Sequence, residues 1–480
     1  VNGQDLTKKM LEKIYSVLLP YPPRNPDRSG KADLALPSIC RLETVKINGK
    51  TVSAPVRPFG SVQWVKLPLE QLKPGEEAEA VIDFRKNAAK NIIPAIAFPN
   101  GNHIYLDRPS DWIDFMKYMH AESVYSLLHN TYGFVYYAKA IPGAIPKINP
   151  NYKGDFLQDF LTLAKENGIT LNGGFYFSFS KIAKDKTKPT RIGKDGKPFK
   201  NGIRVCLLDE KVREQSLASL RQMLKDYPGI DRLELDDNFE MDGKKSCYCA
   251  RCLEKFHQEY PGKQAGPDSP EWDRFWRHQG EILLQQVLKI TRAAGKKLNG
   301  ARKMWVEEGN THSYLSRHCA MIYEFPAFGC SEGIRVLPER GAYSTILWGM
   351  ERDLKEIDKD VREAVFGGSV MISYWLHFFR RKDADNRWGV GTPQNYEEMK
   401  LPNGRLLHGT FEAVSRAYSR LEDHFRDYLA QYLLQGDSRY TVTKAVMDDH
   451  QLRVTIRNTG KLTSAVTGPV DFSEFFRTKK

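Results

Sequence analysis

The sequence lacks any apolar run long enough to cross a bilayer, which requires about 18 consecutive residues. It also lacks an internal repeat and any recognisable nucleic-acid-binding motif, so we expect neither a membrane span nor a specific nucleic-acid partner. No cleavable signal is visible, but the chain begins with Val1 instead of Met. We therefore expect that a leader has been removed and that the protein is secreted or periplasmic.

Acidic residues are too few to balance the basic ones. The 72 Lys and Arg residues outnumber the 59 Asp and Glu residues, which gives a formal net charge of +13. Such an excess favours anionic partners, for example an acidic polysaccharide or a charged cell surface. Eight basic residues lie in residues 181–200 against only Asp185 and Asp195. This segment shows no helical or strand period, so it predicts a solvated loop, which either only aids solubility or clamps a charged glycan.

The 480 residues exceed what a single hydrophobic core usually holds. Residues 1–100 contain an irregular segment and then short β-rich runs with turns at Asn48-Gly49 and Pro74-Gly75, which predicts a small β-sandwich. Residues 101–435 would form the catalytic domain. Residues 436–480 contain two further strand-like runs, which either join the N-terminal sheet or form their own; we favour joining.

From about residue 103 to 435, strand-like runs alternate with helical patterns. This alternation indicates parallel βα units and an α/β fold. A (β/α)8 TIM-type barrel with β-rich N-terminal and C-terminal appendages is the simplest closure. The strands that we expect are residues 124–128, 134–137, 169–179, 232–235, 304–306, 320–323, 344–348 and 370–375, and the clearest helices contain residues 156–164, 217–224 and 283–294.

The most informative of these strands is 232–235, because it runs directly into Asp236 and Asp237. Barrel enzymes carry their catalytic groups at the C-terminal ends of the strands. Strand alternation turns Asp236, like Glu234, toward the barrel axis, so Asp236 is the first candidate and Asp237 the second. The alternative is a pair of aspartates that caps a loop or forms salt bridges.

Cleavage of a glycosidic bond needs a second carboxylate, because one group stabilises the oxocarbenium-like centre and another protonates the leaving oxygen. Glu324 ends the apolar run before Pro326 and is our first choice for the acid. Glu307, Glu308 and Glu351 follow other strand candidates and compete with it.

Three cysteines lie within six residues, at Cys247, Cys249 and Cys252. Clustered thiolates favour zinc, and a closed tetrahedral site needs a fourth ligand, for which Cys206 is the best candidate and His257 the reserve. Such a zinc would brace a loop and would not activate water, so we expect no cofactor for catalysis. Disulfides or free thiols are the alternatives, and export favours disulfides. The other cysteines look isolated: Cys40, Cys319 and Cys330.

The order of several motifs resembles the alpha-L-fucosidase superfamily. These motifs are the segment 124–134 with its His129, the helix from Asp155 to Gly168, the strand with Tyr176-Phe177-Ser178, and Asp236. The resemblance implies that Asp236 or Asp237 is the nucleophile of a retaining enzyme. The His-His pair of that family is His129-Asn130 here, so the sugar does not carry over.

Asp237-Asn238 followed by the cysteine cluster is similar to the zinc-binding segment of family 42 beta-galactosidases, and Cys206 lies at a compatible distance upstream. The Asn-Glu acid of that family is not reproduced, because Phe239 follows Asn238. Hypothetical glycosyl hydrolase families share both sets of features, and this chain resembles them best.

Rim aromatic residues suit the flat faces of sugar rings, although most aromatic residues simply pack in cores. The candidates for substrate contact are the aromatic Tyr132, Trp305, Tyr323, Trp348 and Trp375, and the polar His129, Asn130, Arg204 and His377. The sequence therefore predicts a glycoside hydrolase that acts on an oligosaccharide or polysaccharide, which the positive charge suggests is acidic. Retention is what the fucosidase resemblance implies, and inversion stays open. The alternative is a non-catalytic glycan-binding barrel. The sugar and the oligomeric state stay open.

Overall fold

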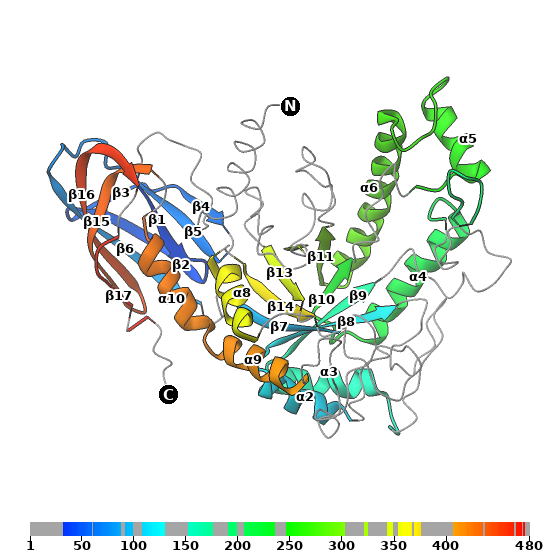
Figure 1. The fold of residues 1–480 in the computed structure, drawn as a ribbon, viewed down its shortest axis with the longest axis horizontal. Coiled ribbons are helices and arrows are strands. Elements are labelled where there is room, and N and C mark those ends of the chain that lie inside the picture. The colour runs from blue at the N-terminus through cyan, green and yellow to red at the C-terminus, as the bar shows by residue number, and fades with distance from the viewer. Residues whose placement is uncertain are drawn as a thin grey trace.

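The computed structural model describes residues 32–59, 61–87, 92–98, 108–129, 152–175, 191–198, 206–235, 246–302, 321–324, 343–348, 354–366, 369–375, 407–434, 437–464, 467–472 and 474–475. Figure 1 shows a central group of strands with helices around it and a separate β-rich part that contains strands from both ends of the chain.

Eight parallel strands pair in a closed order at the centre of the molecule. Each strand pairs with its neighbour in the chain, and the last strand pairs with the first. They are β7 (Ile93–Phe98), β8 (Ser123–His129), β9 (Thr170–Phe175), β10 (Arg232–Leu235), β11 (Lys297–Arg302), β12 (Met321–Glu324), β13 (Tyr343–Trp348) and β14 (Met371–Trp375).

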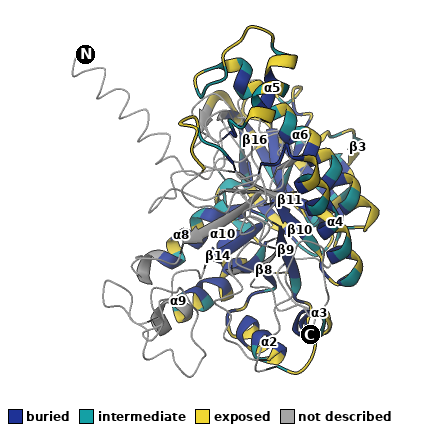
Figure 2. Cartoon of the chain, turned by 90° about the vertical axis from the view of Figure 1, so that its right-hand side faces the viewer, coloured by how far each residue is buried: buried dark blue, intermediate teal, exposed yellow. Residues whose placement is uncertain are grey.

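Helices cover the outside of this ring, and the α/β class predicted from the sequence is confirmed. They are α2 (Pro109–Tyr118), α3 (Phe156–Glu166), α4 (Glu210–Asp226), α5 (Ala250–Glu259), α6 (Pro270–Ala293), α8 (Leu354–Phe366), α9 (Leu407–Ser419) and α10 (Leu421–Tyr432). Figure 2 shows α4, α5 and α6 with exposed outer faces and buried inner ones. None of the described helices has both the length and the apolarity that a membrane span needs.

The sequence pattern of α3 explains why it forms and where it packs. Asp155 caps its N-terminus by accepting a hydrogen bond from the Gln158 amide at 3.2 Å. Its apolar residues recur at helical spacing and are buried, and Phe160 meets Trp112 of α2 edge-to-face at 6.2 Å. α3 is therefore fixed against α2 and leads directly into β9.

Strands from both ends of the chain build the β-rich part. One sheet has the order β1-β5-β4, and the other has the order β17-β15-β16-β6-β2-β3. The C-terminal β16 pairs antiparallel with the N-terminal β6. The strands are β1 (Ala32–Pro37), β2 (Cys40–Ile47), β3 (Lys50–Val52), β4 (Val56–Phe59), β5 (Val62–Leu67), β6 (Glu77–Lys86), β15 (Asp437–Met447), β16 (Gln451–Ser464) and β17 (Val470–Asp471).

Two strands of the ring lie where the sequence pattern did not indicate them. β7 falls inside residues 1–100, and it contains Pro94, which has no amide hydrogen for a strand ladder. β11 has the sequence KLNGAR, with a glycine and no β-branched residue. The expected strands at 134–137 and 304–306 lie outside the described residues.

Candidate functional site

The interior of the ring contains a group of buried polar side chains. Asn172 on β9 donates to Ser123 Oγ on β8 at 3.0 Å and to Met371 Sδ on β14 at 3.6 Å. Since β14 and β9 are not neighbours in the ring, these side chains meet across its interior. The strand positions that share the inward face with Asn172 are here called the inward row. The parallel register extends this row to β10, because Arg232 pairs with Asn172 and Glu234 pairs with Gly174.

This register supports the alternation expected for β10. Glu234 is 2% exposed and belongs to the inward row, whereas Leu233 and Leu235, both fully buried, alternate with it. The chain direction makes Leu235 the last described residue of β10 at the C-terminal end. Asp236 and Asp237, the predicted catalytic pair, come next in the sequence and lie outside the described residues.

Several predicted site residues are described only as strand backbone. The register pairs His129 with Phe175 and Trp348 with Trp375. The remaining candidates lie outside the described residues, so their roles stay predictions: Asn130, Tyr132, Arg204, Trp305, His377 and the competing acids Glu307, Glu308 and Glu351.

Register distinguishes Tyr323 from Glu324 at the end of β12. Tyr323 pairs with Ser344, which pairs with Met371, so its row leads to the residue that Asn172 contacts inside the ring. Glu324 pairs with Arg302 and Thr345 and thus belongs to the alternate row. The acid role assigned to Glu324, like that of its competitors, stays a prediction.

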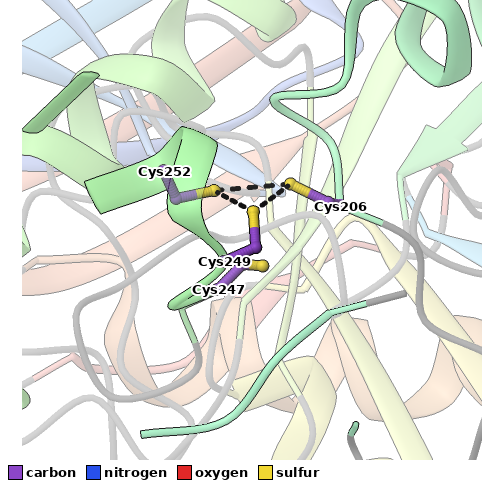
Figure 3. A group of neighbouring side chains, drawn as sticks. All are labelled: Cys206, Cys247, Cys249 and Cys252. Atoms are coloured by element: carbon purple, nitrogen blue, oxygen red, sulfur yellow. Dashed lines mark hydrogen bonds between the residues drawn. The ribbon is translucent and has the colours of Figure 1, made fainter. Parts of the chain in front are cut away.

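The described residue group with the clearest chemistry is the four-cysteine cluster: Cys206, Cys247, Cys249 and Cys252. Their Sγ atoms all lie within 4.8 Å of one another. The distance from Cys206 Sγ to Cys252 Sγ is 3.4 Å, and those from Cys249 Sγ to Cys252 Sγ and Cys206 Sγ are 3.4 Å and 3.9 Å (Figure 3). The structure therefore places these four cysteines side by side.

The fold brings the cluster together from two neighbouring βα connections. Cys206 lies between β9 and α4, three residues before Asp209, which caps α4. Cys247 and Cys249 lie between β10 and α5, and Cys252 is in the first turn of α5. The cluster therefore joins the connection between β9 and α4 to the connection between β10 and α5.

Contacts around the cluster hold both segments in place. Arg251 forms an ion pair with Asp209, which links α5 to the start of α4. Trp272 of α6 donates its indole N–H to Ser246 Oγ at 2.7 Å, and its ring lies 5.0 Å from that of Tyr248. The segment with Cys247 and Cys249 is thereby packed on α6.

Crowding shifts the acidity of the four thiols in opposite directions. Hydrogen bonds lower the pKa of Cys249, and the bond with Cys206 makes the largest contribution. The pKa of Cys206 is raised, mainly by its hydrogen bond with Cys247, and that of Cys252 is raised, mainly by its hydrogen bond with Cys206. Four thiolates this close together would repel one another, so full ionisation of the cluster requires a cation.

The donor set and its dimensions fit a tetrahedral metal ion. Zn–S bonds of about 2.3 Å place the sulfurs of a regular tetrahedron about 3.8 Å apart, close to the distances observed. A disulfide would need about 2.05 Å, and the described cysteines are all free thiols. The cluster can therefore hold a metal. His257, the reserve ligand, is exposed on α5 and is not in the group, and Cys40 is buried in β2.

No protein-family model and no curated protein matches this sequence. Solved structures resemble it to different degrees, at low sequence identity. Alpha-L-fucosidase isoenzyme 2 from Paenibacillus thiaminolyticus has a TM-score of 0.51 and 12% identity over 74% of this chain and 52% of that chain. The beta-galactosidase from Bacillus circulans sp. alkalophilus has a TM-score of 0.45 and 10% identity over 71% and 57%. A GH20 catalytic module of a pneumococcal exo-beta-D-N-acetylglucosaminidase has a TM-score of 0.43 and 10% identity, over 70% of this chain and 85% of that chain.

This chain thus spans about half the length of that fucosidase, 52%. At 12% identity the likeness concerns the fold alone. The fold is one that glycoside hydrolases adopt.

Proposed function

We propose that this chain is a glycoside hydrolase on a (β/α)8 barrel and that Asp236 or Asp237 is its nucleophile. The observation that carries the proposal is the inward position of Glu234 on β10, a strand that the sequence continues into Asp236 and Asp237. The end of a parallel barrel strand is the usual location of catalytic groups in this architecture. The fold likeness to a fucosidase with a TM-score of 0.51 supports the same reading.

In the proposed retaining reaction, one aspartate attacks the anomeric carbon while a second carboxyl group protonates the leaving oxygen. Water then releases the sugar from the enzyme, and the second carboxylate accepts the proton of that water. Glu324 is the first candidate for this second group, and Glu307, Glu308 and Glu351 are its competitors. The positive charge of the chain favours an acidic oligosaccharide or polysaccharide as the substrate.

The test is a panel of aryl glycosides and charged glycans, assayed with the wild type, Asp236→Asn, Asp237→Asn and the double variant. We expect the variant of the nucleophile to lose at least about 100-fold in kcat, because the amide cannot form the glycosyl ester. Asp114→Asn, an exposed aspartate on α2, is the matched control and should retain full activity. The anomeric configuration of the first product, read by NMR, separates retention from inversion.

A non-catalytic glycan-binding barrel is the second candidate. It predicts that glycan binding persists in the double aspartate variant and that the wild type hydrolyses none of the panel. Undiminished hydrolysis by the double variant would instead refute the assignment of Asp236 and Asp237.

We also propose that the four-cysteine cluster holds a structural zinc ion. Zinc would cross-link the two loops and, with four thiolate ligands, would have no open position for water. We expect about one zinc per purified chain, a lower melting temperature after chelation, and recovery on adding zinc back. Elemental analysis and thermal unfolding measure these quantities. Cys40→Ala should keep the zinc, whereas Cys249→Ala should lose it; oxidised cysteines without metal would support the disulfide alternative.

A further inference from the structure

Residues 191–198 form a tight turn, here named the 191–198 turn, in the connection between β9 and α4. Gly193 donates its amide hydrogen to the Lys197 carbonyl at 2.8 Å, and Ile192 forms a bridge with Pro198. Gly196 has a φ of +73°, a conformation that favours glycine. Because this connection follows a ring strand and leads into a helix, it belongs to the C-terminal rim.

The turn is attached to the four-cysteine cluster through the backbone of Ile192. Its amide donates to Cys247 Sγ at 3.4 Å, and its carbonyl accepts a hydrogen bond from the Tyr248 amide at 2.8 Å. Arg191 is 4% exposed, whereas Lys194 is exposed at the tip of the turn. One end of the turn is therefore buried against the segment that carries the proposed metal ligands.

This attachment depends on where Cys247 Sγ is held. Amide hydrogen bonds to ligand atoms orient metal sites. A bound cation would fix Cys247 Sγ beside the sulfurs of Cys206, Cys249 and Cys252, and so within hydrogen-bond distance of the Ile192 amide. Without the cation, the four sulfurs would no longer share a central ion, and the contact between Ile192 and Cys247 would open more often.

We propose that the metal ion in the four-cysteine cluster holds the 191–198 turn on the rim, with Ile192 as the residue through which it acts. The inference rests on the proposed metal site and is independent of the catalytic assignment. Metal loading then sets the position of the 191–198 turn, which carries Lys194 and Lys197, against the segment with Cys247 and Tyr248.

Limited trypsin digestion of the zinc-loaded and chelated protein tests the proposal. The Lys194–Asp195 bond lies at the exposed tip of the turn, whereas trypsin does not cleave Lys197–Pro198. We expect chelation to accelerate cleavage at Lys194–Asp195 by at least about tenfold, since cleavage follows the population of the open loop. The Lys50–Thr51 bond, next to the β2–β3 hairpin turn, is the internal control and should be cleaved at an unchanged rate.

Variants distinguish metal coupling from simple packing. Cys252→Ala removes a ligand that is not hydrogen-bonded to Ile192, and Cys247→Ala removes both a ligand and the acceptor. Under the proposal both variants release the turn in the presence of zinc. Under simple packing only Cys247→Ala does so. If a variant does not fold, hydrogen exchange of residues 191–198 in the chelated wild type gives the same readout.

Two outcomes would overturn the inference in different ways. If about one zinc is bound per chain and its removal leaves cleavage at Lys194–Asp195 and hydrogen exchange unchanged, the metal site stands and the coupling is refuted. If the chain binds no zinc, the metal site and the coupling both fall. The aspartate variants test the glycosidase proposal separately in either case.

Discussion

Asp83 on β6 accepts hydrogen bonds from both neighbouring strands of the six-stranded sheet. Its donors are Thr44 Oγ1 and Lys46 Nζ on β2, the latter at 3.2 Å, and Gln451 Nε2 on β16 at 2.6 Å. These contacts, led by the hydrogen bond from Thr44, lower the pKa of Asp83 to about 2. In the unfolded chain the pKa of an aspartate is about 3.9. Between pH 4 and 2 the folded chain therefore binds fewer protons at Asp83 than the unfolded chain does.

We predict that Asp83→Asn lowers the free energy of unfolding by about 1 kcal/mol at pH 7, a figure reduced for the partial exposure of this carboxylate. The difference from the wild type should persist above about pH 4 and disappear as the pH falls toward 2. Urea denaturation across this pH range measures it. Glu79→Gln, an exposed acid on the same strand, is the control. A difference that is independent of pH would show that the charge of Asp83 is not what stabilises the sheet.

At the level of helices and strands, the sequence pattern predicts those elements whose own residues determine them. The strand at 232–235 and the helix around Phe156 agree with β10 and α3, since their apolar periods are strong and their ends are marked. β7 and β11 were not recognised, because their place in the ring comes from pairing with distant strands. Tertiary context overrides weak strand propensity in such cases.

In the candidate site, too, features set by residues close in sequence could be predicted, and features set by distant residues could not. Cys247, Cys249 and Cys252 are close in sequence, and only one further cysteine of the group had to be found. The contact between Ile192 and Cys247 could not be predicted, because it uses a backbone amide that any residue would provide. The choice of the second carboxylate depends on register between strands far apart in the sequence, which a single sequence does not contain.

At the scale of the whole molecule, the two ends of the chain are joined in one sheet. β16 pairs along its length with β6, and β6 pairs with β2. Leu452 on β16 is fully buried and stands opposite Ile82 on β6, which is also fully buried. The stability of the N-terminal strands therefore depends on residues added more than 350 positions later, as the 368-residue separation of Asp83 and Gln451 illustrates.

We predict that Leu452→Ala lowers the free energy of unfolding by about 2 to 5 kcal/mol, since it leaves a cavity between β16 and β6. Leu462→Ala is the matched control on the same strand; Leu462 is 48% exposed, so its loss should change stability by less than about 0.5 kcal/mol. Hydrogen exchange should show that Leu452→Ala weakens protection in β6 as well as in β16, because the two strands share a hydrogen-bonded ladder. Loss of protection in β16 with β6 unaffected would mean that the C-terminal strands unfold without the N-terminal ones.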